Sequence, residues 1–106
     1  MPKYMIQATY TAEGLKGVLR DGGTARRQAV DRMVSSLGGT VEQMYFAFGD
    51  NDVFLLVDLP SNADSAALSL TVSAAGGVRT KTSVLLTTEE IDEAARKQVD
   101  YQAPGA

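Results

Sequence analysis

The chain of 106 residues contains no cysteine, no histidine and no tryptophan, and only three prolines. Without cysteine it offers no disulfide, no thiolate nucleophile, and no zinc-ribbon or iron–sulfur site. Without histidine it has no imidazole base, no histidine–metal site and no proximal haem ligand. The side chains left for chemistry are Asp, Glu, Lys, Arg, Tyr, Ser and Thr. This inventory is poor for acid–base catalysis, and we expect neither a metal nor a cofactor.

Positive charge is also scarce, because ten Lys and Arg face thirteen Asp and Glu, which gives a net charge of −3. A surface that binds phosphates usually needs a clear positive excess, so nucleic acid is not an expected partner. No apolar run approaches the ~18–20 residues that span a bilayer, so we expect no membrane contact. The first residues lack the apolar segment of a signal peptide. We therefore expect a cytoplasmic protein.

Hydrophobic residues make up 44% of the chain and charged residues 22%, which is typical of a globular protein. A length of 106 residues corresponds to one domain. We predict a single domain over residues 1–99. A polar tail over residues 100–106 follows, which we expect to be mobile or to lie on a partner.

Apolar periodicity predicts the order strand, helix, strand, strand, helix, strand, helix. Tyr4 to Tyr10 alternate as a two-faced strand, while residues 11–23 indicate a long loop or a short helical turn, because their glycines weaken a helix. A helix is predicted to begin at Thr24 and to end at Gly38. The remaining predicted elements are strands over 40–48, 53–59 and 78–86, a helix over 63–75, and a last helix over 88–98 opened by a capping box.

This order is the split βαβ, or ferredoxin-like, arrangement, so we predict an α+β fold: a βαββαβ sandwich with an added C-terminal helix. Helices cover one face of such a sheet. The strand over 53–59 is apolar at nearly every position, which is typical of burial on both faces. An exposed apolar face marks an interface. We therefore expect a homodimer, or a higher oligomer, in which two sheets stack as a dimeric α/β barrel.

Aromatic residues cluster on the first two predicted strands. They either line an apolar pocket between sheet and helices or form ordinary core. Arg79 and Lys81 share one face of the last strand. They either bind an anionic ligand within the dimer or protect an exposed sheet edge from pairing. The predicted ligand-binding residues are Tyr4, Tyr10, Phe46, Phe48, Arg79 and Lys81.

Two further groups of residues carry weaker signals. Lys16 and Arg26 could close the mouth of such a pocket or simply be solvated. Asp50, Asp52 and Asp58 could bind a hard cation, but turns favour aspartate in any case. We therefore predict no metal site, and no catalytic residue can be assigned.

Several segments resemble the small bacterial GYD-domain proteins. They are Pro2 to Met5, Asp21 to Thr24, Tyr45 to Asp52, Val78 to Thr82, and Leu85 to Glu90. The family's naming motif is Gly, a spacer, Tyr and Asp. Here Gly49 and Asp52 match, and Asn51 stands in the place of the tyrosine. We predict that this motif is a hairpin turn, in which Asn51 adopts a positive φ.

The resemblance implies ferredoxin-like protomers that pair as a dimeric α/β barrel. That larger group includes cofactor-independent monooxygenases, haem enzymes, isomerases and amino-acid-sensing modules, so fold alone does not select a function. Three hypotheses follow. The protein binds or senses a small, partly apolar molecule. Alternatively, it is a cofactor-independent monooxygenase or isomerase for an aromatic or enolisable substrate, or an assembly protein without a ligand.

Overall fold

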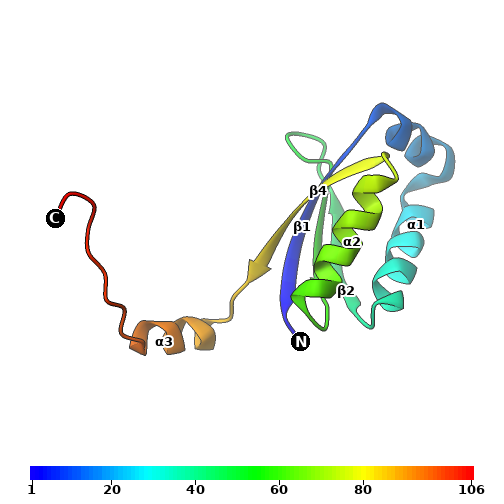
Figure 1. The fold of residues 1–106 in the computed structure, drawn as a ribbon. Coiled ribbons are helices and arrows are strands. Elements are labelled where there is room, and N and C mark those ends of the chain that lie inside the picture. Colours follow the sequence, from blue (N-terminus) through cyan, green and yellow to red (C-terminus); the bar gives the residue numbers. More distant parts are fainter.

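A four-stranded antiparallel sheet, in the order β2-β3-β1-β4, carries two helices on one of its faces (Figure 1). The computed structural model describes residues 1–106. The predicted α+β ferredoxin-like arrangement with an added C-terminal helix is confirmed. The elements are β1 (Lys3–Tyr10), α1 (Ala12–Ser36), β2 (Thr40–Phe46), β3 (Val53–Asp58), α2 (Asn62–Ala74), β4 (Val78–Leu85) and α3 (Thr88–Arg96).

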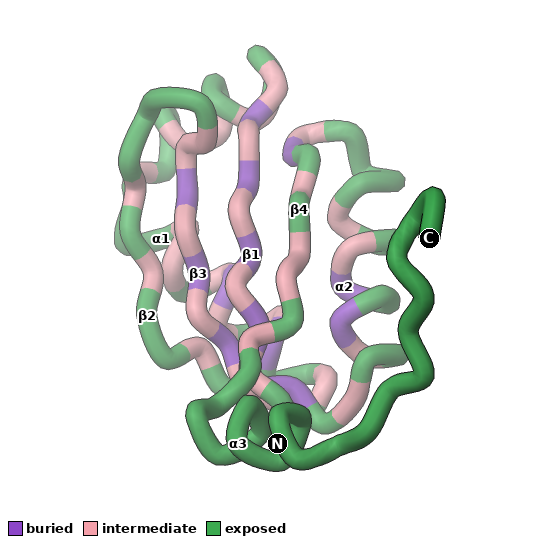
Figure 2. The backbone as a smooth tube through the Cα atoms, turned by 90° about the vertical axis from the view of Figure 1, so that its left-hand side faces the viewer, coloured by how far each residue is buried: buried purple, intermediate pink, exposed green.

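The apolar core lies between the sheet and the helices α1 and α2. Its position follows from the alternation of the strands, in which every second residue of β1 and β3 is buried (Figure 2). The phenol of Tyr4 is buried at the base of this core, and its hydroxyl donates to Asn62 Oδ1 at 2.7 Å. The buried hydrophobic residues are Tyr4, Ile6, Ala8, Tyr10, Val30, Val34, Val53, Leu55, Val57, Leu59, Leu68 and Val78.

Helix α1 begins much earlier than the sequence predicts. Residues 12–21 are helical, although we predicted a loop or a short turn there, and Gly22 then interrupts the helix with a φ of 83°. A second helical segment continues to Ser36. The predicted stop is confirmed, because Gly38 adopts a φ of 81° just beyond the helix. The kink at Gly22 makes α1 two short helices joined at an angle, which matters for the site below.

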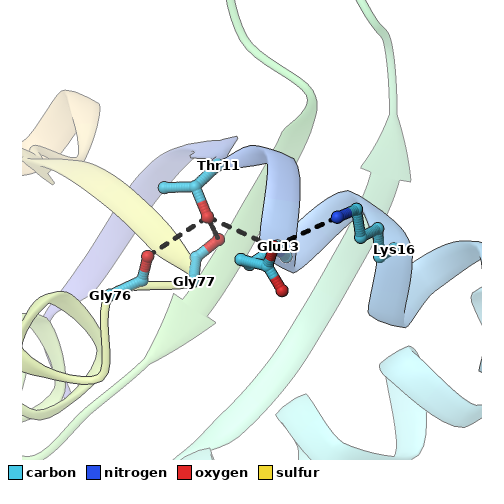
Figure 3. Close-up of polar contacts among 6 residues, drawn as sticks. Thr11, Glu13, Lys16, Gly76 and Gly77 are labelled. Carbon is cyan, nitrogen blue, oxygen red and sulfur yellow. Dashed lines mark hydrogen bonds and ion pairs between the residues drawn. The ribbon is translucent and has the colours of Figure 1, made fainter.

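The first turn of α1 is fixed by its contact with the start of β4 (Figure 3). The Thr11 backbone N–H donates to the Gly77 carbonyl at 3.0 Å. The Thr11 hydroxyl lies 3.1 and 3.2 Å from the carbonyl oxygens of Gly76 and Gly77, and it accepts from the Gly14 N–H as the helix cap. A Cβ at Gly14 would lie 2.1 Å from the Gly77 oxygen, so only glycine permits this approach.

Strand β2 and the loop after it depart from the predicted alternation. A bulge between Val41 and Gln43 shifts the register, and the strand ends at Phe46 rather than at residue 48. The expectation for Asn51 is wrong, because the positive φ in this loop, 52°, belongs to Phe48. Phe48 is 59% exposed and stacks on Phe46 with ring centroids 5.9 Å apart.

The face of the sheet opposite α1 and α2 has no covering element, and we call it the open face. The register places Met5, Leu56 and Phe54 next to one another there, all half-buried. One face of β3 is therefore buried within the chain, and the other is half-buried on the open face. At the base of the open face, Lys3 bridges Glu42 and Asp58, its amine lying 2.9 Å from Asp58 Oδ1.

Helix α3 and the residues after it project away from the sheet, on the side of the open face (Figure 1). The predicted capping box is confirmed, because Thr87 and Glu90 exchange both of its hydrogen bonds. No residue of α3 is buried. None of the helices is both long enough and apolar enough to cross a membrane.

Candidate functional site

A cleft lies between the two segments of α1, the second half of α2 and the first residues of β4. Its volume is about 480 Å³, within the range of small-molecule sites. It exists because the chain turns at Gly22, so that the two helical segments form separate walls. The lining residues include Tyr10, Gly17, Val18, Arg26, Val72 and Val78.

Arg26 has an incomplete set of hydrogen bonds in this cleft. Its Nε is buried without any hydrogen-bond partner. Its guanidinium carbon lies 5.9 Å from the centre of the Tyr10 ring, a cation–π arrangement. Both side chains also line an adjoining void of about 30 Å³ in the apolar core. A buried N–H without an acceptor is costly, so this donor favours an acceptor supplied from the cleft.

The other charges around the cleft are already paired. Arg20 donates two hydrogen bonds to the Asp21 carboxylate, from Nε to Oδ1 at 3.0 Å and from Nη2 to Oδ2 at 3.2 Å. This hydrogen bonding lowers the pKa of the Asp21 carboxyl and raises that of the Arg20 guanidinium. Glu13 lies 3.2 Å from the amine of Lys16. Arg26 is therefore the cation of the cleft that has no carboxylate partner.

The predicted aromatic ligand-binding residues do not gather in one place. Tyr10 lines the cleft. Tyr4 is fully buried in the core, and its hydroxyl is occupied by Asn62. Phe46 and Phe48 stack on each other at the end of β2 and its loop, and neither lines the cleft.

The two predicted cationic residues lie on the opposite side of the sheet from the cleft. Arg79 and Lys81 are exposed on the open face of β4, an edge strand. Neither forms an ion pair within the chain. They therefore lie outside the cleft, which Tyr10 lines and which neither of them lines.

Sequence reasoning placed Arg26 at a pocket mouth but missed the walls of the cleft. Those walls contain Gly14 and Gly17, whose low helix propensity predicts a loop, and Gly22, which is predicted to close that loop. Several glycines on one helix leave space beside it, because they have no side chains to fill that space. Lys16, predicted to close the pocket with Arg26, does not line the cleft.

The aspartates of the central loop have structural roles. The Asp52 carboxylate accepts from the Tyr10 N–H at 2.9 Å, and the Asp52 N–H donates to the Ala8 carbonyl at 2.8 Å. Asp58 lies at the other end of β3 and pairs with Lys3. The chain contains no group of three or more acidic residues that could hold a metal ion, so the possible cation site at Asp50, Asp52 and Asp58 does not form.

The sequence of the chain matches one known protein family. The family model described as GYD domain matches residues 4–95, which include the sheet, the cleft and most of α3. No curated protein and no solved structure matches the chain.

Proposed function

The chain belongs to the GYD domain family, and we propose that it is a homodimeric protein that binds or senses a small molecule. The molecule is partly apolar and carries a carboxylate or a similar anionic group. It occupies the cleft between the two segments of α1, with its anion at Arg26 and its apolar part against Val18, Val72 and Val78.

The observation that carries this proposal is the buried, unpartnered Nε of Arg26 beside the cleft. A guanidinium presents planar donors that fit a carboxylate, and such charge-assisted hydrogen bonds are about twice as strong as neutral ones. The Tyr10 ring holds the guanidinium from one side. An anionic ligand would complete the hydrogen bonding of Arg26 with a charge-assisted bond, whereas a neutral acceptor would form a weaker one.

Binding is favoured over catalysis because the cleft lacks an acid–base pair. Its carboxylates are paired with Arg20 and Lys16, and the pairing lowers the pKa of Asp21, which makes this carboxylate a weaker base. No histidine or cysteine exists to replace them. Recognition of a ligand by shape and one charge is the chemistry that these side chains support.

The open face supports the dimer. Met5, Phe54 and Leu56 present an apolar surface that only a second layer can cover. A second copy is the proposed layer, because a sheet stacked on an identical sheet buries both surfaces at once.

Native mass spectrometry of protein purified without added ligand tests the dimer and the occupied cleft together. We expect a dimer whose mass exceeds that of two polypeptides. Calorimetric titration with 3-phenylpropanoate, and with the uncharged 3-phenylpropanol as its control, then tests the anion. The carboxylate should bind more tightly by roughly tenfold or more.

Three variants locate the binding. Arg26→Met should remove the preference for the carboxylate, whereas Arg32→Met, on the exposed side of α1, should keep it. Gly17→Leu should reduce the volume of the cleft, because Gly17 lines it and an added Cβ would meet no other atom within 4 Å. Equal binding of the two probes to the wild-type protein, or unchanged binding by Gly17→Leu, would refute the proposed site.

A further inference from the structure

The C-terminal arm, residues 88–106, has no residue buried against the rest of the chain. Ile91 is 51% exposed, Val99 81% and Tyr101 73%. Helix α3 contains nine residues, and isolated helices shorter than about 12–15 residues are marginal in water. Ile91, Ala94 and Ala95 share one side of α3, with acidic residues on the other sides. An amphipathic helix of this kind gains its stability by packing on another surface.

The arm also carries the whole net charge of the protein. Residues 1–87 contain eight basic and eight acidic residues, and the arm contains two basic and five acidic ones. The rest of the molecule is thus neutral, while the arm is strongly acidic for its length. Its docking surface should therefore be basic.

The open face offers such a surface along β4. Four basic side chains in residues 1–87 make no ion pair, and two of them, Arg79 and Lys81, lie two residues apart on this strand. Ser83 and Leu85 continue the same face along β4. We call Arg79, Lys81, Ser83 and Leu85 the β4 margin. It combines two unpaired cations with apolar area at an unprotected sheet edge.

The arm does not reach the β4 margin of its own chain. It leaves the end of β4 on the side of the open face and points away from the sheet (Figure 1). A second copy whose open face approaches this side meets the arm first. We propose that the acidic arm of one copy docks on the β4 margin of a second copy. This inference rests on the dimer of the proposed function, and it adds which segment and which edge hold the two copies together.

The proposed contact satisfies both partners. In the proposed contact, Leu85 covers the apolar side of α3, and the flanking carboxylates pair with Arg79 and Lys81. The docked arm also covers an edge strand that is otherwise open to pairing with other chains. Because the contact is reciprocal in a symmetric dimer, each copy gives one arm and receives one.

The absence of native cysteine allows a direct test in the full-length chain. Ala94→Cys is introduced in one chain and Ser83→Cys in a differently tagged chain, and the two are co-expressed and treated with a short bis-maleimide. A product that carries both tags joins two chains, so contact within one chain cannot produce it. Ser73→Cys, exposed on α2, replaces Ser83→Cys as the matched control. We expect cross-linking at 83 and not at 73.

Charge reversal gives an independent readout. Arg79→Glu with Lys81→Glu should weaken dimerisation by roughly tenfold or more in sedimentation experiments, and the difference should shrink at high salt. Arg32→Glu is the control and should leave the dimer unchanged. If the protein is a dimer but no cross-link forms at position 83, docking of the arm on the β4 margin is refuted and the proposed dimer stands. A wild-type monomer overturns both, and a cross-link within a single chain carrying both cysteines overturns docking on a second copy.

Discussion

Two glycines in the first segment of α1 should respond in opposite directions to the same substitution. Gly14 and Gly17 both lie in residues 12–21, three positions apart. A Cβ at Gly14 would lie 2.1 Å from the backbone oxygen of Gly77, whereas a Cβ at Gly17 would meet nothing within 4 Å. Gly14→Ala should therefore destabilise the protein, and Gly17→Ala should stabilise it.

The magnitudes follow from three contributions. Forcing extra volume into a packed contact costs about 1–3 kcal/mol. Moving α1 away from β4 breaks the hydrogen bond from Thr11 N–H to Gly77, at about 1 kcal/mol. Alanine in place of helical glycine returns up to about 1 kcal/mol. The expected loss of unfolding free energy for Gly14→Ala is about 1–3 kcal/mol, and the expected gain for Gly17→Ala is about 0.5–1 kcal/mol.

Urea unfolding followed by far-ultraviolet circular dichroism measures both changes. With a slope of about 1–3 kcal/mol per molar urea, the two midpoints should lie on opposite sides of the wild-type midpoint. In thermal unfolding, each kcal/mol corresponds to about 4–8 °C for a domain of this size. If both variants are stabilised to the same extent, the close approach of α1 to β4 does not exist, and the position assigned to the first segment of α1 is wrong.

Three further outcomes are expected from single contacts. Tyr4→Phe removes the hydroxyl that donates to Asn62 and should lower the unfolding free energy by about 0.5–1.5 kcal/mol in urea titrations, with no change in 3-phenylpropanoate binding. Asp52→Ala removes the acceptor of the Tyr10 N–H and should lower the unfolding free energy by about 1.5–3 kcal/mol. Asp52→Asn keeps an acceptor and should lower it by less in the same assay. Equal losses for the two variants would contradict the hydrogen bond. Hydrogen bonds to Glu42 and Asp58 raise the pKa of the Lys3 amine above 10.5. The contribution of Lys3 to stability is therefore complete below pH 10.5 and is lost as the pH rises through the folded-state pKa. Titration of the Lys3 ¹³Cε resonance by NMR should show the raised midpoint.

The sheet could be predicted from the sequence because its signals are local. Tyr4 to Tyr10 alternate without interruption, and in the structure one of the two predicted faces is buried along the whole strand. The stop at Gly38 and the capping box at Thr87 are each encoded by a few adjacent residues. Patterns of this kind involve residues close together in the chain, so a short stretch of sequence is enough to predict them.

The first segment of α1 could not be predicted because its glycines act through tertiary contacts. Intrinsic propensity counts Gly14 as a cost of about 1 kcal/mol, but in the fold it allows α1 to contact Gly77. The cleft depends on this segment and on the kink at Gly22, so it was missed with them. The side of the sheet on which Tyr10 lies could be predicted, because Tyr10 follows the alternation of β1. Phe48 was predicted to lie in a strand but lies in the following loop, because β2 contains a bulge and ends at Phe46.

The uneven distribution of charge has a consequence for the colloidal behaviour of the protein. Proteolysis at the exposed link before α3 would leave residues 1–87, whose acidic and basic residues are equal in number. A protein with a net charge near zero at working pH associates and precipitates more readily, since mutual repulsion between molecules is lost. The arm therefore acts as a solubilising appendage as well as a contact, and preparations that lose it should be recognised by their turbidity at neutral pH.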